Sequence, residues 1–179
     1  MTLAVRPATT DDVWAVHETA RASWHAAYDD VLGSDMVDEI VDDWYAIGDL
    51  ESSIDDASRR HNVAFVLVDP GDESTDGVFA DGCRGFAHVV PWPEDSSVAY
   101  LAQLYVRPDS WREGVATTLL DRLEAEFDDS FDRFRIAVLA DNDVGVSFVE
   151  SSGFERVERR KTGFSSALEE YVYEKRIRP

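Results

Sequence analysis

The residues best suited to hold a ligand lie between about positions 104 and 117, where a β-branched and aromatic run gives way to a helical pattern. Pro108 ends the predicted strand, and the helix opens at Gly114 with small side chains. Small residues let a backbone approach a ligand closely, and the first turn of a helix has N–H groups without intrahelical partners. Those groups and the helix dipole favour an anion such as a pyrophosphate. Arg112 adds a charged donor, whereas Glu113 is unfavourable near phosphates and is expected to point outward.

A glycine at a helix start also fits an ordinary tight turn between a strand and a helix. The segment lacks the Gly-Lys-Ser/Thr of a P-loop and the three glycines of a dinucleotide fingerprint. A second segment strengthens the case for a binding site. There a predicted strand at 136–139 is followed, across a short predicted helix, by Asn142, Phe148 and Gly153.

These two segments must be positioned by a surrounding sheet. Hydrophobic periodicity and turn residues predict strands at 3–6, 63–68, 84–90, 98–106, 134–139, 154–160 and 169–177. They predict helices at 9–28, 34–44 with a further helical stretch after Gly48, 114–127 and 143–151. The expected order is β-α-α-β-β-β-α-β-α-β-β, which indicates a single α/β domain over residues 1–179 with a mixed sheet.

The charge of the chain is unusual, at a formal −20 with 37 acidic and 17 basic residues. Lys161 and Lys175 are the only lysines, and the acids are dispersed along the sequence. Dispersed acid favours a solvated surface adapted to a high-salt cytoplasm, where screening reduces self-repulsion; an ordinary acidic enzyme is the alternative. Nucleic acid is disfavoured as a partner, because phosphate contacts require a basic face.

Cys83 is the single cysteine, so an intramolecular disulfide framework and a cysteine metal cluster are excluded. His17, His25 and His61 show no spacing typical of a metal site, and no metal is expected. The first ten residues lack the apolar run of a signal peptide, and no window approaches a membrane span. We therefore expect a soluble cytoplasmic protein that does not bind membranes.

The two segments resemble motifs of the GNAT superfamily of N-acetyltransferases. The first motif is matched by Pro108, Trp111, Gly114 and Ala116, and the second by Asn142, Phe148, Gly153 and Phe154. The element order is also similar over essentially the whole chain, which implies a GNAT-like mixed central sheet flanked by helices. The stretch 23–28 looks like one frequent in members that acetylate small amines.

The resemblance implies that acetyl-CoA lies in a V-shaped opening between the strands that end at Val106 and near Leu139. Backbone groups of the first strand would hold the pantetheine arm, and amides of the following loop and helix would hold the pyrophosphate. Asn142 and Phe148 would flank the arm. The implied cofactor-binding residues are Leu104, Tyr105, Val106, Trp111, Arg112, Glu113, Gly114, Val115, Ala116, Thr117, Asn142 and Phe148.

Two positions depart from the family pattern, and both concern proton transfer. Val149 stands where the family often has a tyrosine that can protonate the departing thiolate, and Tyr100 stands where a subgroup has a glutamate base. Positioning of two bound reactants can contribute more than general acid–base help, so catalysis can survive this loss. The candidate catalytic residues are Tyr100, Tyr105 and His88, with Tyr173 as a further proton donor. His88 also fits a strand residue with an ordinary hydrogen bond.

Trp24 and Tyr28 are four residues apart on one predicted helix face, which suits either an acceptor pocket or core packing. The expected reaction is transfer of an acetyl group to a primary amine of a small molecule or peptide, by direct attack. An acyl-CoA-binding sensor without turnover is the alternative, and O-acetylation or another acyl donor stays open. The last predicted strand could pair or pack across a homodimer.

Overall fold

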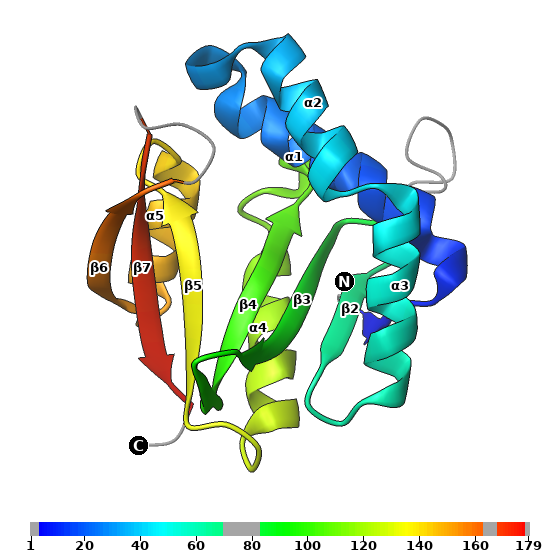
Figure 1. Ribbon diagram of the computed structural model, residues 1–179, viewed down its shortest axis with the longest axis vertical. Helices are drawn as coiled ribbons and strands as arrows, with labels where there is room; N and C mark the ends of the chain where they lie inside the picture. The colour runs from blue at the N-terminus through cyan, green and yellow to red at the C-terminus, as the bar shows by residue number, and fades with distance from the viewer. Residues whose placement is uncertain (1–3, 70–82, 163–167, 178–179) are drawn as a thin grey trace.

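The computed structural model describes residues 4–69, 83–162 and 168–177 (Figure 1). Its elements, in chain order, are β1 (Val5–Pro7), α1 (Val13–Leu32), α2 (Ser34–Trp44), α3 (Ile47–Arg59), β2 (Ala64–Val68), β3 (Gly85–Trp92), β4 (Asp95–Val106), α4 (Val115–Phe127), β5 (Arg133–Leu139), α5 (Asp143–Ser151), β6 (Glu155–Lys161) and β7 (Glu169–Arg176). Short 3-10 turns at Thr10–Asp12 and Pro108–Ser110 precede α1 and α4.

The seven strands form one mixed sheet in the order β1-β2-β3-β4-β5-β7-β6. β4 and β5 are parallel, and the other neighbouring strands are antiparallel. Helices α4 and α5 lie on one face, and α1, α2 and α3 lie on the other (Figure 1). The predicted class, an α/β domain with a mixed sheet flanked by helices, is confirmed.

A reciprocal contact between Thr9 and Asp12 precedes the start of α1. The Thr9 N–H donates to the Asp12 carboxylate at 2.8 Å, and the Asp12 N–H donates to the Thr9 carbonyl at 2.9 Å. Arg6, on β1, donates two hydrogen bonds of 2.9 Å to the same carboxylate. This charge-assisted contact fixes the start of α1 against the edge of the sheet.

The predicted order lacks one helix. We expected Gly48 to interrupt the second helix, but the break falls at Tyr45 and Ala46, and Gly48 lies in the first turn of α3. Ala46 is extended, with φ −56° and ψ 142°. The break lets the Tyr45 ring enter the core, where it is 3% exposed. A tertiary contact therefore decides where the helix ends, and local propensity does not.

Two hydrophobic clusters hold the sheet between its helix layers. On the α4 side, Leu119, Leu123 and Phe127 are at most 1% exposed and pack against the strands. Each such side chain contributes about 1.5–3 kcal/mol on burial. The second cluster joins α1, α2 and α3 to the opposite face through residues such as Trp24 and Phe86.

Strand β3 extends further than predicted. Pro91 and Trp92 belong to β3, and Pro91 lies opposite Ala99 of β4, where we expected proline to end the strand. A register irregularity between Pro91 and Trp92 accompanies this pairing, which agrees with the tolerance of proline at bulges. No helix in the described part of the chain is long and apolar enough to cross a membrane.

Candidate acyl-CoA site between the parted strands

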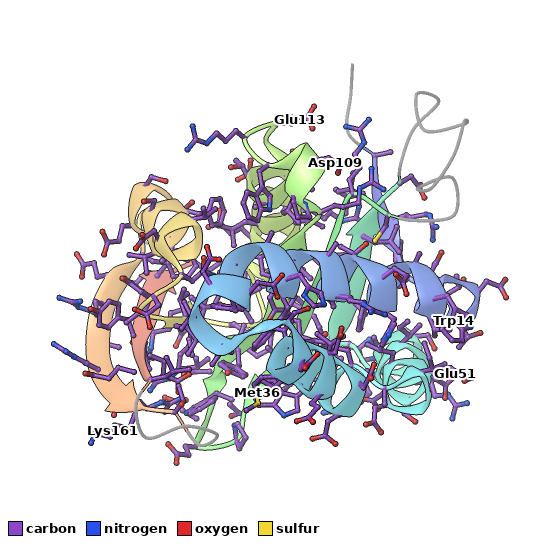
Figure 2. The ribbon with its side chains drawn as sticks, turned by 90° about the horizontal axis from the view of Figure 1, so that it is seen from above. Trp14, Met36, Glu51, Asp109, Glu113 and Lys161 are labelled. Carbon is purple, nitrogen blue, oxygen red and sulfur yellow. The ribbon has the colours of Figure 1, made fainter. Side chains whose placement is uncertain are left out.

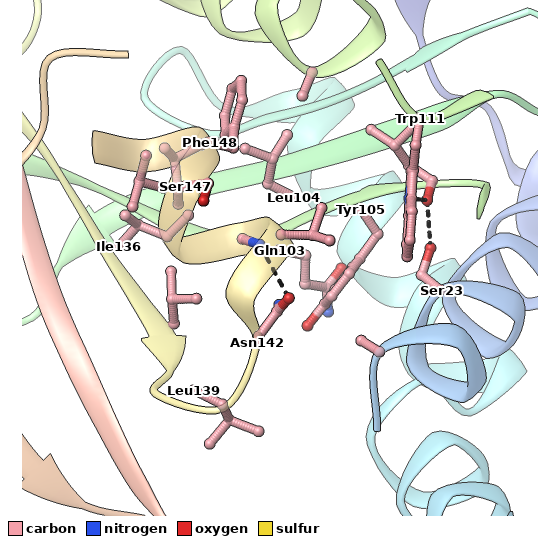
Figure 3. Close-up of a pocket in the computed structure, with 18 of the residues that line it drawn as sticks. Ser23, Gln103, Leu104, Tyr105, Trp111, Ile136, Leu139, Asn142, Ser147 and Phe148 are labelled. Atoms are coloured by element: carbon pink, nitrogen blue, oxygen red, sulfur yellow. Dashed lines mark hydrogen bonds between the residues drawn. The ribbon is translucent and has the colours of Figure 1, made fainter. Parts of the chain in front are cut away.

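The central feature of the site is a parting of the sheet. Three residue pairs join β4 to β5, at 98–100 against 133–135, and beyond Tyr100 the described strands diverge. The divergence opens a cavity of about 880 Å³ between the second half of β4 and the end of β5 (Figure 3). The V-shaped opening implied by the sequence resemblance is therefore present at the expected strands.

A bulge in β4 determines which side chains face each half of the cavity. Gln103 pairs with His88 and Leu101 pairs with Val89, so Ala102 is an extra residue without a partner on β3. An extra residue shifts the alternation of faces by one. Leu101 and Leu104 consequently both pack on the α4 side, and Tyr105 packs on the α1 side. Nothing in the local sequence marks this bulge.

The parted edge of β4 presents backbone groups to the cavity. The Arg107 N–H donates at 2.8 Å to the carbonyl of Arg84, the residue just before β3. Because bonded and non-bonded pairs alternate in an antiparallel ladder, Leu104 and Val106 direct their N–H and C=O groups away from β3, toward the opening. The Tyr105 N–H is directed to β3. The Val106 N–H therefore faces the cavity.

Two side chains from separate elements bind the Val106 carbonyl. The Ser23 hydroxyl on α1 and the Trp111 indole N–H each donate to it at 2.8 Å (Figure 3). Trp111, which was predicted to contact the cofactor, lines the cavity and also fixes the end of β4. These two donors and the bond from the Arg107 N–H to Arg84 fix the peptide unit between Val106 and Arg107.

The loop before α4 forms one end of the cavity. Arg112 has φ 66° and Gly114 has φ 85°, two left-handed residues in a three-residue stretch. A non-glycine residue in that region is strained, and such strain concentrates at functional sites. The first bond of α4 runs from Thr118 N–H to the Gly114 carbonyl at 2.9 Å, so the preceding amides have no partner within the helix.

These amides, at Val115, Ala116 and Thr117, line the cavity together with Arg112. Helix dipole and unpaired N–H groups make the position suitable for a phosphate group. Glu113 is exposed and lies at the periphery of the molecule, as expected (Figure 2). The Glu113 side chain is not among those that line the cavity.

The other wall of the opening is the start of α5. The Asn142 side chain accepts from the Gly145 N–H at 3.0 Å, which caps the helix, and its Nδ2 donates to the Tyr28 hydroxyl at 3.0 Å. Asn142 therefore links α5 to α1 across the mouth of the cavity. Phe148 lines the cavity as predicted, and Val149 is 2% exposed and packs in the α4-side cluster.

Aromatic side chains form the wall on the α1 side. The Trp24 indole N–H donates to the Tyr45 hydroxyl at 3.2 Å, and the Tyr45 hydroxyl donates to that of Tyr105 at 2.7 Å. Burial raises the pKa of Tyr105 above its usual value of about 10, so the phenol stays protonated at neutral pH. Its own proton is then available to a group in the cavity.

Tyr100 lies deeper in the opening, with its ring centroid 4.9 Å from that of Trp92. Burial, followed by the charge of Glu170, raises the pKa of Tyr100, so this phenol is not poised to act as a base. Glu170, on β7, lines the cavity and was missed in the sequence analysis. No local signal marks it, because its position depends on β7 lying beside β5.

His88 and Tyr173 lie elsewhere. His88 is not among the described residues that line the cavity; it stacks on Phe65 with ring centroids 4.9 Å apart. Burial lowers the pKa of His88 to about 4, which leaves it neutral at pH 7. The Tyr173 hydroxyl donates to Glu150 of α5 at 2.8 Å, and Tyr173 is not among the described residues that line the cavity. The structure therefore favours the alternative interpretation of His88 as a strand residue and does not bring either side chain to the cavity.

Among the described residues, no group of three or more histidine, cysteine, aspartate or glutamate side chains could hold a metal ion.

The seven-stranded mixed sheet parts between two parallel strands, and a helix begins at the parting. This fold is shared with known acetyltransferases. The family model described as the acetyltransferase (GNAT) family matches residues 24–154. The chain belongs to this family. No curated protein sequence is significantly similar to the chain.

Solved structures share the fold at low sequence identity. PaiA N-acetyltransferase from Thermoplasma acidophilum, in complex with coenzyme A, is 20% identical with a TM-score of 0.78, over 98% of this chain and 99% of that one. The ribosomal-protein-S18-alanine N-acetyltransferase of Escherichia coli is 15% identical with a TM-score of 0.69, over 99% and 96%. An acetyltransferase from Thermus thermophilus is 20% identical with a TM-score of 0.66, over 98% and 97%.

Proposed function

We propose that this chain transfers an acetyl group from acetyl-CoA to a primary amine of a small molecule or peptide, by direct attack of the amine on the thioester. Membership of the acetyltransferase family supports the reaction class. The structural neighbours include one solved with coenzyme A and one described as acetylating an alanine of a ribosomal protein. Both descriptions agree with an acyl-CoA donor and an amine acceptor.

The parted edge of β4 is the observation that carries the proposal. Leu104 and Val106 direct backbone groups into the same cavity that is lined, at its mouth, by the amides of Val115 to Thr117. A pantetheine arm needs backbone partners along its length and a pyrophosphate needs N–H donors at one end. The residues present fit both ends of acetyl-CoA.

The Val106 N–H is suited to stabilise charge on the thioester oxygen during attack. This N–H shares its peptide unit with the Tyr105 carbonyl, and Tyr105 pairs with Phe86 of β3, so the peptide plane is fixed before substrate binds. A preorganised donor of this kind contributes typically 10²–10³-fold to the rate.

Tyr105 is suited to assist departure of the thiolate. The hydrogen-bond chain from Trp24 through Tyr45 leaves the Tyr105 O–H as a donor toward the cavity. Because burial raises the pKa of Tyr105, the phenol donates a hydrogen bond to the departing sulfur and does not give up its proton permanently. A thiolate is a tolerable leaving group with this degree of help.

A thiol-release assay tests the proposal. Purified protein is incubated with acetyl-CoA and a panel of primary amines, peptide N-termini and lysine side chains, and free CoA is measured. Each assay is run in about 0.1 M and about 1 M KCl, because charge screening differs between the two salt concentrations. We expect release that depends on the amine. Failure of the whole panel to release CoA in both salts would exclude transfer to amines.

An acyl-CoA sensor without turnover is the second candidate, and Val149 favours it. Val149 is 2% exposed and packed against the core, so no tyrosine occupies the family's usual proton-donor position. Calorimetry separates the two candidates. Tight acetyl-CoA binding without turnover supports a sensor, and binding with turnover supports the transferase.

A further inference from the structure

The acceptor side of the cavity contains a carboxylate that neither motif includes. Among the described residues that line the cavity, the ionised side chains are Arg112, Asp143 and Glu170. Arg112 and Asp143 are exposed and lie at the starts of α4 and α5, on the donor side. Glu170 is the carboxylate that remains for the acceptor.

Strand alternation places Glu170 on the face of the sheet away from α5. Tyr171 and Tyr173 pack against the cluster on the α4 and α5 side, so Glu170, which precedes Tyr171 on β7, faces the other way. Glu170 pairs with Leu139, at the end of β5, and Leu139 packs in the cluster that also contains Trp24. The charge of Glu170 also raises the pKa of Tyr100, which agrees with the two groups lying near each other.

The Glu170 carboxylate is held by one arginine. Arg160 Nε donates to Oε1 at 2.6 Å, and the Glu170 side chain retains 21% exposure. Oε2 accepts no hydrogen bond from the described residues. Oε1 is therefore anchored to β6, and the Glu170 side chain also lines the cavity.

We propose that Glu170 binds the ammonium group of the acceptor and takes one of its protons, and that the acceptor is a monoamine with an apolar or aromatic group. The inference rests on the proposed transfer to an amine. One carboxylate matches one cationic centre. The same cavity is lined by aromatic rings of α1 and of the residue that follows α2, which include Trp24, Tyr28 and Tyr45. Aromatic faces also favour a cation or a flat apolar group beside them.

The proposed transfer conserves atoms and charge. The ammonium loses one proton to Glu170, and the freed nitrogen lone pair forms a bond to the thioester carbon. The carbon–sulfur bond then breaks, and its electron pair leaves with sulfur as the thiolate. The second nitrogen proton ends on that thiolate, and the proton on Glu170 passes to water. The products are the N-acetyl amine, CoA thiol and one proton.

Glu169 provides a matched control for Glu170. Both are on β7, and each pairs with an arginine of β6, but Glu169 pairs with Arg159 and does not line the cavity. Arg160→Gln is a second control, because it breaks the ion pair while keeping the carboxylate. The three variants, Glu170→Gln, Glu169→Gln and Arg160→Gln, are compared with the unmodified chain.

The readouts are acetyl-CoA affinity by calorimetry, melting temperature, and kcat and KM for benzylamine, 2-phenylethylamine, propane-1,3-diamine and a peptide N-terminus. We expect Glu170→Gln to lower kcat/KM for amines at least about 30-fold, with acetyl-CoA affinity unchanged, since base catalysis typically contributes 10²–10⁴-fold. Glu169→Gln should stay within about threefold, and Arg160→Gln should lose about fivefold. Benzylamine or 2-phenylethylamine should be preferred over the diamine.

Three outcomes would overturn the proposal. Equal activity of Glu170→Gln and Glu169→Gln would show that Glu170 takes no part in the reaction. An Arg160→Gln loss as large as that of Glu170→Gln shows that the ion pair, and not the carboxylate, matters. Preference for the diamine or the peptide contradicts the acceptor class. A different result, in which the unmodified chain binds acetyl-CoA but shows no turnover, would contradict the proposed transfer itself. That result concerns the unmodified chain alone and is therefore distinguishable from the three outcomes above.

Discussion

The two sides of the cavity are built by different means. The donor side consists largely of main-chain groups, from the open edge of β4 and the first turn of α4, set by two left-handed residues, Arg112 and Gly114. The proposed acceptor side consists of side chains from α1, the end of α2, β4 and β7, joined by contacts such as the Tyr45 to Tyr105 hydrogen bond. One side depends on backbone conformation and the other on side-chain identity.

This difference suggests how each side tolerates substitution. A backbone site survives most side-chain changes, provided that φ and ψ are kept. A site made of side chains changes with every substitution, which allows one fold to accept different amines. Substitutions on the donor side should therefore affect cofactor affinity, and those on the acceptor side should affect turnover.

The largest expected effect is on the donor side, at Gly114. Gly114→Val places a β-branched residue at φ 85°, which should rearrange the loop and misdirect the first amides of α4. Loss of one or two hydrogen bonds to a charged group, at about 1.5–3 kcal/mol each, should weaken acetyl-CoA binding about 100-fold by calorimetry. Gly48→Ala, in open space in α3 with ordinary φ, is the control and should leave affinity unchanged.

Tyr105 should give the next largest effect, on kcat and not on acetyl-CoA affinity. Tyr105→Phe removes the donor to the thiolate and keeps the ring, so kcat should fall about 30-fold while acetyl-CoA affinity stays within about twofold. Thiol release and calorimetry measure the two quantities. A loss of affinity that matches the loss of kcat would contradict the division between the two sides.

The variant His88→Phe tests whether His88 is a buried neutral residue that takes no part in the reaction. The pKa of His88 is lowered from 6.5 to about 4, so the unfolded chain binds a proton that the folded chain does not, and stability falls as pH drops below 6.5. Between about pH 7.5 and about pH 5.5 this amounts to about 1.3 kcal/mol. Urea unfolding should show that His88→Phe loses less stability than the unmodified chain over this interval, by about that amount.

The same variant should keep the pH profile of kcat. A profile that changes in His88→Phe would return His88 to the candidate bases and would contradict its placement outside the cavity.

The smallest effect is expected where the two sides meet, at the hydrogen bond from Asn142 to Tyr28. Tyr28→Phe removes this bond and should lower the free energy of unfolding by about 1 kcal/mol. A double-mutant cycle with Asn142→Ala measures the coupling and removes the contribution of the helix cap. Coupling near zero would show that the two sides are energetically independent.

Much of the donor side could be predicted from the sequence. Pro108, Gly114 and Asn142 act through local backbone geometry, and such geometry follows from residue types over a few positions. The resemblance to a known family also placed the parting between β4 and β5 at the correct elements.

What the tertiary structure decided depends on residues far apart in the chain. Tyr45 ends α2 because its ring packs beside Trp24, and the bulge at Ala102 determines which face Tyr105 occupies. Glu170 reaches the acceptor side through the pairing of β7 with β5, which no local pattern encodes. Side-chain sites are assembled by long-range packing, and so the sequence by itself determined the donor end of this protein, while the fold decided the acceptor end.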